Sequence, residues 1–189
     1  RVDPQGLHVV PFKKPTTEEL DHDFLWRVHK EVPAKGQIAI FNRSHYEDII
    51  AVRVKKIFPD PVWKRRYKHV LDFESMLAEE GTVIIKLFLN ISKEEQKKRL
   101  ESRLQDPDKL WKFCMDDLDD RNRWDEFQTA YQDLIEKTST PEAPWYIIPA
   151  DRKWYRNLVV ARLMVEKLRH LQLSLPTPNF DPASIIIPD

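Results

Sequence analysis

Glycine is scarce in this sequence of 189 residues, where it occurs only at Gly6, Gly36 and Gly81. A loop that cradles phosphate with successive backbone N–H groups needs several glycines close together. These residues therefore cannot form such a loop. Because the sequence begins at Arg1 rather than at methionine, we expect any glycine-rich phosphate loop to lie upstream of Arg1.

Cysteine is scarce as well, and the sequence has neither a long apolar run nor a net charge. The single Cys114 excludes an internal disulfide and a cysteine-ligated metal cluster, and it favours a reducing, cytoplasmic compartment. No apolar run approaches the roughly 18 residues of a membrane-spanning helix, so we expect no membrane segment. The 31 lysine and arginine residues balance 31 aspartate and glutamate residues, which argues against a generally basic nucleic-acid binder.

Short apolar runs alternate with helical patterns along the chain. Strands are predicted over residues 7–12, 37–41, 82–90 and 145–149. Ile38–Phe41 and Val83–Leu89 are apolar at nearly every position, as in parallel strands that are covered on both faces. The predicted fold class is therefore α/β, with a parallel sheet sandwiched by helices.

Capping residues and apolar spacing mark the helices between these strands. Helices are predicted over residues 17–32, 45–54, 62–80, 93–104, 119–137 and 152–171, with N-caps at Thr16, Ser44, Ser92 and Asp151. Residues 106–118 are predicted to form a loop. The last stretch is rich in proline, with Pro176, Pro178, Pro182 and Pro188, and is predicted to be an extended tail.

A burst of polar residues follows the apolar strand Ile38–Phe41, since every side chain from Asn42 to Asp48 is polar. In open α/β sheets the carboxyl ends of the strands bind ligands. Arg43 stands at this position, and a guanidinium can bind phosphate through two donors in fixed geometry. The simpler alternative is a strand followed by solvent-exposed polar residues that bind no ligand.

Positive charge is concentrated in residues 53–69. Seven basic residues lie there against the single acidic residue Asp60, which gives a local surplus of six: Arg53, Lys55, Lys56, Lys64, Arg65, Arg66 and Lys68. The run is either a solvated helix face or a track for a long polyanion, which would release condensed counterions on binding. Nucleic acid would also be attracted, but no recognition motif accompanies the run.

Residues 93–123 contain nine basic and nine acidic side chains, so their net charge is zero. Arg99 and Arg103 lie four residues apart and would share a helix face. Asp106-Pro107-Asp108-Lys109-Leu110-Trp111-Lys112 follows them. On charge alone this segment could be a pair of salt-bridged helices.

In their order and spacing, these segments resemble the family-2 polyphosphate kinases, a branch of the P-loop kinases, from Asp3 to roughly Leu173. The resemblance rests on residues 13–16 (Lys-Lys-Pro-Thr), 37–48, 93–123, 143–145 (Ala-Pro-Trp) and 151–157. It implies a P-loop NTPase/kinase-like fold with a helical lid over about residues 93–123. The implied domain covers residues 1–173 without its N-terminal part, and a proline-rich tail covers residues 174–189.

The resemblance implies transfer of a phosphoryl group between inorganic polyphosphate and a nucleoside mono- or diphosphate, with Mg²⁺ as cofactor. The implied catalytic residues are Arg43, Arg103, Lys112 and Arg121. The implied nucleotide- and cofactor-binding residues are Lys14, Lys109, Asp151 and Lys153. The implied polyphosphate-binding residues are Arg53, Lys64, Arg65 and Lys68. Asn42 stands where many P-loop kinases carry a Walker B aspartate, and its carbonyl or a bridging water would reach the metal.

Two alternatives stay open at this point. An ATP-dependent nucleoside or nucleotide monophosphate kinase would share the fold and the lid. A non-catalytic polyanion-binding domain would explain the missing glycine-rich loop. The expected partners are polyphosphate, a nucleotide and further copies of the same chain, and neither nucleic acid nor a membrane is expected.

Overall fold

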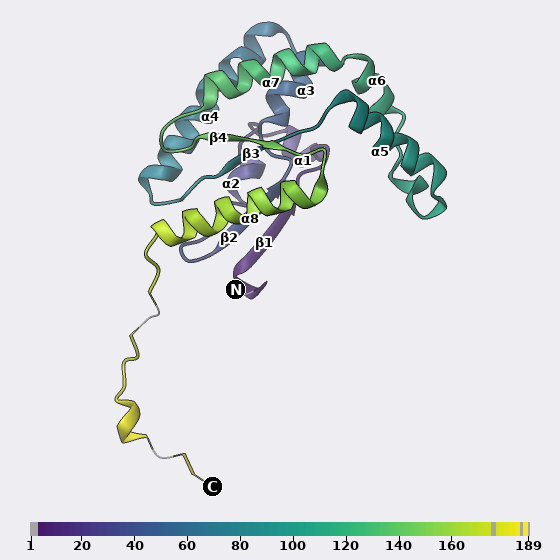
Figure 1. Cartoon of the computed structure of the whole chain (residues 1–189). Helices are drawn as coiled ribbons and strands as arrows, with labels where there is room; N and C mark the ends of the chain where they lie inside the picture. Colours follow the sequence, from purple (N-terminus) through teal and green to yellow (C-terminus); the bar gives the residue numbers. More distant parts are fainter. Residues whose placement is uncertain (1–3, 175–176, 186, 189) are drawn as a thin grey trace. The chain divides into compact units, whose positions relative to one another are not determined.

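The computed structural model of the chain describes residues 4–174, 177–185 and 187–188, whose helices and strands are labelled in Figure 1. The chain divides into two compact units. The first unit comprises Arg1–Phe88 and Ser92–Ile147, and the second comprises Leu89–Ile91 and Ile148–Asp189. None of the helices in the described ranges has both the length and the apolar character to cross a membrane.

The first unit contains a parallel strand pair. Strand β1 (Leu7–Pro11) follows the short 3₁₀ helix η1 (Pro4–Gly6) and pairs with β2 (Ile38–Asn42) from Leu7↔Ile38 to Pro11↔Asn42. The pairing continues one residue further, because the Phe12 N–H donates to the carbonyl of Asn42 at 3.1 Å. The α/β class with parallel strands is therefore confirmed.

Strands β3 (Lys86–Asn90) and β4 (Trp145–Pro149) form a second two-stranded sheet, and the boundary between the two units runs across both strands. Within the described residues the four strands thus make two pairs rather than one continuous sheet. Strand β4 has its predicted bounds. Strand β3 is shorter than predicted, because residues 82–85 have no regular secondary structure.

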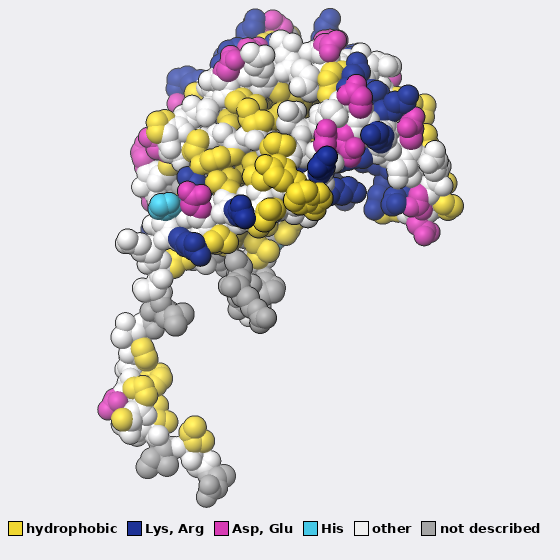
Figure 2. All heavy atoms as spheres, in the orientation of Figure 1, with side chains coloured by type: hydrophobic (Ala, Val, Ile, Leu, Met, Phe, Trp, Pro, Cys, Tyr) yellow, Lys and Arg dark blue, Asp and Glu magenta, His cyan; other side chains and the backbone are white. Residues whose placement is uncertain are grey.

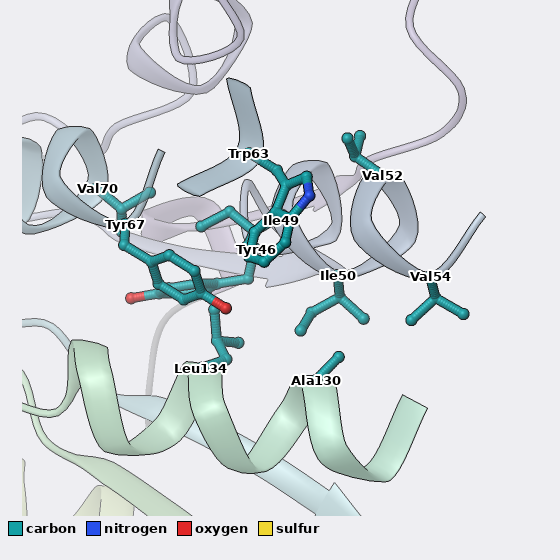
Figure 3. Close-up of a cluster of buried hydrophobic side chains, with 10 residues drawn as sticks. All are labelled: Tyr46, Ile49, Ile50, Val52, Val54, Trp63, Tyr67, Val70, Ala130 and Leu134. Atoms are coloured by element: carbon teal, nitrogen blue, oxygen red, sulfur yellow. The ribbon is translucent and has the colours of Figure 1, made fainter. Parts of the chain in front are cut away.

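Three helices of the first unit enclose its larger core. They are α3 (Glu47–Val54), α4 (Asp60–Glu79) and α7 (Trp124–Thr138). Helix α4 contributes Trp63, Tyr67 and Val70, whose spacing of four and three residues places them on one face. Figure 3 shows these side chains meeting Tyr46 and the apolar residues of α3 and α7. The members are Tyr46, Ile49, Ile50, Val52, Val54, Trp63, Tyr67, Val70, Ala130 and Leu134.

A smaller core covers the β1–β2 pair. Val10 and Phe12 pack there with Val28 from α2 (Trp26–His29) and Phe73 from α4. Phe41 of β2 lies edge-on to Phe12, with ring centroids 5.0 Å apart. Helix α4 therefore supports both cores, with Trp63, Tyr67 and Val70 in one and Phe73 in the other.

The predicted helix over residues 17–32 is wrong, since the chain forms α1 (Thr17–Leu20) and α2 separated by a turn. The predicted capping box is confirmed: Thr16 Oγ1 accepts from the Glu19 N–H at 3.2 Å, and Glu19 accepts from the Thr16 N–H at 2.8 Å. The turn is stabilised by Asp23, whose carboxylate accepts from the Leu25 N–H at 2.9 Å and competes with helix continuation.

The segment predicted to be a lid contains α5 (Lys93–Gln105), η2 (Pro107–Lys112) and α6 (Asp116–Asn122). Ser92 is confirmed as the N-cap of α5, since its hydroxyl accepts from the Glu95 N–H at 3.1 Å. The predicted loop over residues 106–118 is wrong, because Asp106 caps η2 and α6 begins at Asp116. The predicted helix over residues 119–137 is interrupted at Arg123, whose guanidinium donates to the carbonyl of Val54 at 3.0 Å.

Two predicted N-caps are wrong. Helix α3 begins at Glu47 rather than next to Ser44, whose hydroxyl instead accepts from the Tyr46 N–H at 3.4 Å. In the second unit, α8 (Lys153–His170) has Arg152 rather than Asp151 at its N-cap position, and the Arg152 side chain makes no capping hydrogen bond. The described part of the tail contains the short helix η3 (Pro182–Ser184), and residues 175, 176, 186 and 189 lie outside the described residues.

Candidate active site

The turn after β2 presents Arg43 to solvent. Arg43 has a left-handed backbone with φ of 62°, and its side chain is 64% exposed. The nearest carboxylate is that of Glu47, 4.0 Å away. The turn is closed by backbone hydrogen bonds from Glu47 to Ser44 at 3.1 Å and from Asp48 to His45 at 3.1 Å. An exposed guanidinium thus stands directly beyond the carboxyl end of β2, as the sequence predicted.

His45 and Tyr46, the next residues of the turn, point inward and are buried. The Tyr46 hydroxyl donates to the Glu74 carboxylate, and His45 Nε2 lies 3.5 Å from the same oxygen, Oε1. Neither ring nitrogen of His45 has a hydrogen-bond partner of good geometry among the described residues. Burial raises the pKa of Tyr46 far above its usual value, and the neighbouring Glu74 raises it further.

A buried ion pair lies behind this turn. Lys86 Nζ donates to Glu74 Oε2 at 2.7 Å and to the carbonyl of Thr138 at 2.6 Å. The side chains of Glu74 and Lys86 are 5% and 4% exposed. Burial by itself would raise the pKa of Glu74, but the neighbouring imidazole of His45 and the charge of Lys86 hold it below its usual value. Glu74 is therefore an ionised carboxylate in the interior of the first unit.

Glu74 and Lys86 were missed by the sequence analysis, although both leave a signal in the pattern. Glu74 continues the spacing of Trp63, Tyr67 and Val70, so it occupies a core position of α4. Lys86 interrupts the apolar run that was predicted to be a covered strand. Opposite charges at two positions that are otherwise apolar indicate a buried pair.

Asp48 is held away from solvent by two arginines. Its carboxylate accepts from Arg27 Nη2 at 3.3 Å, and its carbonyl accepts from Arg66 at 2.5 Å. Burial raises the pKa of Asp48, although Arg27 and Arg66 oppose the shift. Arg27 also donates to the carbonyl of Lys13 at 2.9 Å, which ties the residues after β1 to α3. Asp48 therefore joins α3 to Arg27 of α2 and Arg66 of α4 at this edge.

The predicted metal ligand Asn42 ends β2 with an exposed side chain. Glu47 lies nearby in the same turn, and burial raises the pKa of its carboxyl despite the charge of Arg43. Within the described ranges no three side chains of histidine, cysteine, aspartate or glutamate converge on one point. The described residues alone do not build a closed metal site.

The basic side chains of the predicted lid are largely paired within it. Arg103 donates to Asp117 at 3.0 Å and to the carbonyl of Lys112 at 3.5 Å. Arg121 donates to the carbonyl of Lys93 at 2.7 Å and to Gln96 at 2.9 Å. These contacts hold α6 and η2 against α5, and Figure 2 shows basic and acidic side chains intermixed over this segment.

Lys109 and Lys112 differ from these arginines. Lys109 of η2 pairs with Asp106, the N-cap of that helix. Lys112 is exposed and lies over the ring of Trp111, with its Nζ 4.9 Å from the ring centroid. Lys14 is 94% exposed and lies 3.9 Å from Asp116 of α6. The structure thus places Lys14 beside the predicted lid.

The predicted polyphosphate-binding residues separate into two groups. Arg53 donates to Asp133 of α7 at 2.6 Å and lies over the ring of Trp63, so it joins α3, α4 and α7. Lys64, Arg65 and Lys68 are exposed on α4. Lys64 pairs with Asp60 at 2.8 Å and Lys68 with Asp72 at 2.5 Å. Contact with polyphosphate would require Arg53 to leave Asp133 of α7, whereas Lys64 and Lys68 would leave only exposed partners on their own helix.

Asp151 and Lys153 lie in the second unit. Asp151 is exposed before α8, and Lys153 is the exposed first residue of that helix. One face of α8 carries a pocket that contains none of the predicted site residues. It is lined by Ala161, Arg162, Val165, Glu166, Arg169 and His170.

Comparison with known proteins identifies the family. The model of the family Polyphosphate kinase 2 (PPK2) matches residues 1–175. The AMP/ADP-polyphosphate phosphotransferase of Meiothermus ruber is 53% identical over 98% of this chain and 70% of its own length. The ADP-polyphosphate phosphotransferase of Rhodopseudomonas palustris is 39% identical over 93% of this chain and 65% of its own length.

A solved structure gives the same result for the fold. The polyphosphate kinase 2 of Arthrobacter aurescens TC1 superposes with a TM-score of 0.93 at 49% identity, over 96% of this chain and 64% of that chain. The chain thus spans about two thirds of the length of the proteins it matches. Both the extent of the family match and the identity to these relatives lead to one conclusion: the chain belongs to the polyphosphate kinase 2 family.

Proposed function

We propose that the protein moves a terminal phosphoryl group between inorganic polyphosphate and a nucleoside mono- or diphosphate. The observation that carries this proposal is the family match over residues 1–175, together with 53% identity to a protein named AMP/ADP-polyphosphate phosphotransferase. The name of that relative supports both AMP and ADP as acceptors. The exposed Arg43 at the end of β2 is consistent with the proposal.

The proposed chemistry is stabilisation of charge by positioned cations. In phosphoryl transfer the charge spreads over the phosphoryl oxygens, and the protein contributes positioning and electrostatics rather than covalent steps. We assign this contact to Arg43 and Lys112, which are exposed. Arg103 and Arg121 stay predicted contacts, and each would have to exchange a bond within the lid for a bond to phosphate. Lys109 would exchange its bond to Asp106 in the same way.

Mg²⁺ stays the proposed cofactor. Magnesium is commonly held by one or two protein oxygens together with substrate phosphates, so a closed protein site is not required. Asn42, the last residue of β2, and Glu47, the first residue of α3, carry side-chain oxygen atoms on either side of the turn and are the residues that would contact the ion. When bound, the ion would neutralise part of the charge on the phosphoryl oxygens.

We also propose a homo-oligomer and a reducing, cytoplasmic compartment. The single free Cys114 supports the compartment. Size-exclusion chromatography with light scattering would decide the first proposal, and a mass of about one chain would contradict it. Fractionation of cells that express the protein would decide the second.

The experiment for the function is incubation of the full-length protein with ADP, Mg²⁺ and polyphosphate, without ATP. The proposal expects ATP to form in proportion to the polyphosphate consumed, and AMP to yield ADP in a parallel reaction. An ATP-dependent nucleotide kinase would instead phosphorylate AMP only when ATP is supplied. A polyanion-binding domain would retain polyphosphate on a filter and form no nucleotide product in either mixture.

A further inference from the structure

The buried pair of Glu74 and Lys86 has no direct access to a substrate. Both side chains are at most 5% exposed. Two buried charges are costly to remove from water, and this cost is offset only where both partners are well hydrogen-bonded. Glu74 binds Lys86 and the Tyr46 hydroxyl, and Lys86 also binds the carbonyl of Thr138.

This pair connects four elements at one point. Glu74 belongs to α4, Lys86 begins β3, Thr138 ends α7, and Tyr46 lies in the turn after β2. Thr138 extends the network, because its hydroxyl accepts from Trp145 Nε1 at 2.9 Å and donates to the carbonyl of Leu134 at 2.7 Å. The turn after β2 is therefore attached to the interior through Tyr46.

Packing reinforces this attachment. Tyr46 packs against Trp145 with ring centroids 4.8 Å apart, and Figure 3 shows it within the apolar cluster. The ring of His45 lies 4.4 Å from that of Tyr46 and 6.0 Å from that of Phe73. His45 and Tyr46 thus anchor the turn directly after Arg43 and Ser44.

The Arg43 side chain contributes little to fixing its own conformation, since its one ion pair, with Glu47, is 4.0 Å long. Its side chain is mostly exposed, and its backbone adopts the left-handed conformation that non-glycine residues disfavour. Such a conformation persists only when the surrounding structure determines it. The backbone of Arg43 is held on its C-terminal side by the buried residues His45 and Tyr46, and on its N-terminal side by the pairing of β2 with β1.

We propose that Glu74 and Lys86 are positioning residues that, through Tyr46 and His45, fix the turn in which Arg43 is presented to phosphate. The contact of Arg43 with phosphate rests on the proposed function, whereas the fixing of the turn does not. Neither Glu74 nor Lys86 touches substrate in this proposal. Any effect of their replacement on transfer should therefore depend on the presence of the Arg43 side chain.

The first test is a double-mutant cycle on transfer from polyphosphate to ADP in the full-length protein. Tyr46→Phe removes only the hydroxyl that reaches Glu74 and keeps the ring in the core. Glu74→Gln removes the charge. In the unmodified background, each replacement should lower kcat about tenfold and leave KM for ADP within about twofold. In an Arg43→Ala background, each replacement should lower kcat at most about threefold further.

Glu79→Gln is the matched control, since Glu79 is an exposed residue of the same helix and is absent from the network. It should retain the kcat of the unmodified protein. Full tenfold losses for both variants in the Arg43→Ala background would overturn the proposal, because the pair would then act independently of Arg43. Unchanged kcat in Tyr46→Phe and Glu74→Gln would overturn it as well. If Glu74→Gln does not fold, Tyr46→Phe decides alone.

The second test does not depend on activity. Trypsin cleaves after arginine in segments that open, so cleavage between Arg43 and Ser44 reports how firmly the turn is held. The fragment beginning at Ser44 should form at least about tenfold faster in Tyr46→Phe and Glu74→Gln than in the unmodified protein or Glu79→Gln. Equal rates in all four proteins would refute the fixing of the turn. If the unmodified protein transfers no phosphoryl group but the cleavage rates differ as expected, the proposed function fails and the anchored turn stands.

Discussion

Replacing Arg43 by alanine and by glycine should separate its side chain from its backbone. The left-handed conformation at φ of 62° costs a non-glycine residue about 1–2 kcal/mol. Alanine keeps this cost and removes the guanidinium. Glycine removes both the conformational cost and the guanidinium. Its greater freedom in the unfolded chain, however, lowers the free energy of unfolding by about 0.5–1 kcal/mol. The two variants therefore differ in stability but share the loss of the charge.

The expected magnitudes follow from the surroundings of Arg43. Its one ion pair, with Glu47 at 4.0 Å, is exposed, and such pairs contribute about 0–1 kcal/mol. Arg43→Ala should therefore lower the free energy of unfolding by less than about 1 kcal/mol, and Arg43→Gly should leave it unchanged or raise it by up to about 1 kcal/mol. Loss of a contact to transition-state charge costs about 2–4 kcal/mol, so both variants should lower kcat at least tenfold.

The measurements are urea denaturation and ATP formation from ADP and polyphosphate in the full-length protein. Lys35→Ala is a suitable control, because Lys35 is an exposed cation in the connection that precedes β2. It should change neither quantity. Normal turnover in Arg43→Gly would show that the guanidinium does not serve the reaction. A large loss of stability in Arg43→Ala would show that the side chain supports the fold instead.

Three further outcomes are expected. Lys86→Met should lower the free energy of unfolding by about 3–5 kcal/mol in urea denaturation, because it leaves Glu74 buried without its partner, and adding Glu74→Gln should restore most of the loss; equal stability of the single and double variants would contradict this. Because the pKa of Glu74 is lowered from 4.5 in the folded protein, the unfolded chain binds more protons between the two values. Stability should therefore fall as the pH decreases from 4.5 through the folded pKa, and Glu74→Gln should flatten this part of the curve; an unchanged acid limb would argue against an ionised Glu74. Replacing Lys64 and Lys68 by glutamate should weaken binding of long polyphosphate more than short polyphosphate and should make its salt dependence shallower; equal losses would indicate a solvated face.

Sequence patterns predicted elements well where one local signal determined them. Strand β4 has its predicted bounds, and α4 begins two residues and ends one residue away from the predicted helix. The caps Thr16 and Ser92 are confirmed because a hydroxyl and a backbone N–H three residues later are sufficient to form them. Ser44 failed as a cap because Tyr46, two residues later, is drawn into the core and starts the helix from there.

The position of Arg43 could be predicted, but its conformation and its support could not. An apolar run followed by polar residues identifies the end of a strand from local sequence alone. The left-handed backbone and the buried contacts of His45 and Tyr46 depend on Glu74 and Lys86, which lie 28 and 40 residues beyond Tyr46 in the sequence. No periodicity within one element reports contacts over such separations.

The charges of residues 93–123 are a second case in which the sequence alone could not decide between two interpretations. Their sum of zero fitted both a salt-bridged helix pair and a phosphate-closing lid. The structure shows the internal pairs of the first interpretation, and the second stays a prediction. Arg103 and Arg121 hold α6 and η2 against α5 through Asp117, Gln96 and backbone carbonyls. Because an anionic substrate offers the same guanidinium groups charged oxygen acceptors, it would compete with these internal partners rather than meet free cations. A charge count cannot separate the two functions, since the same arginines would perform both.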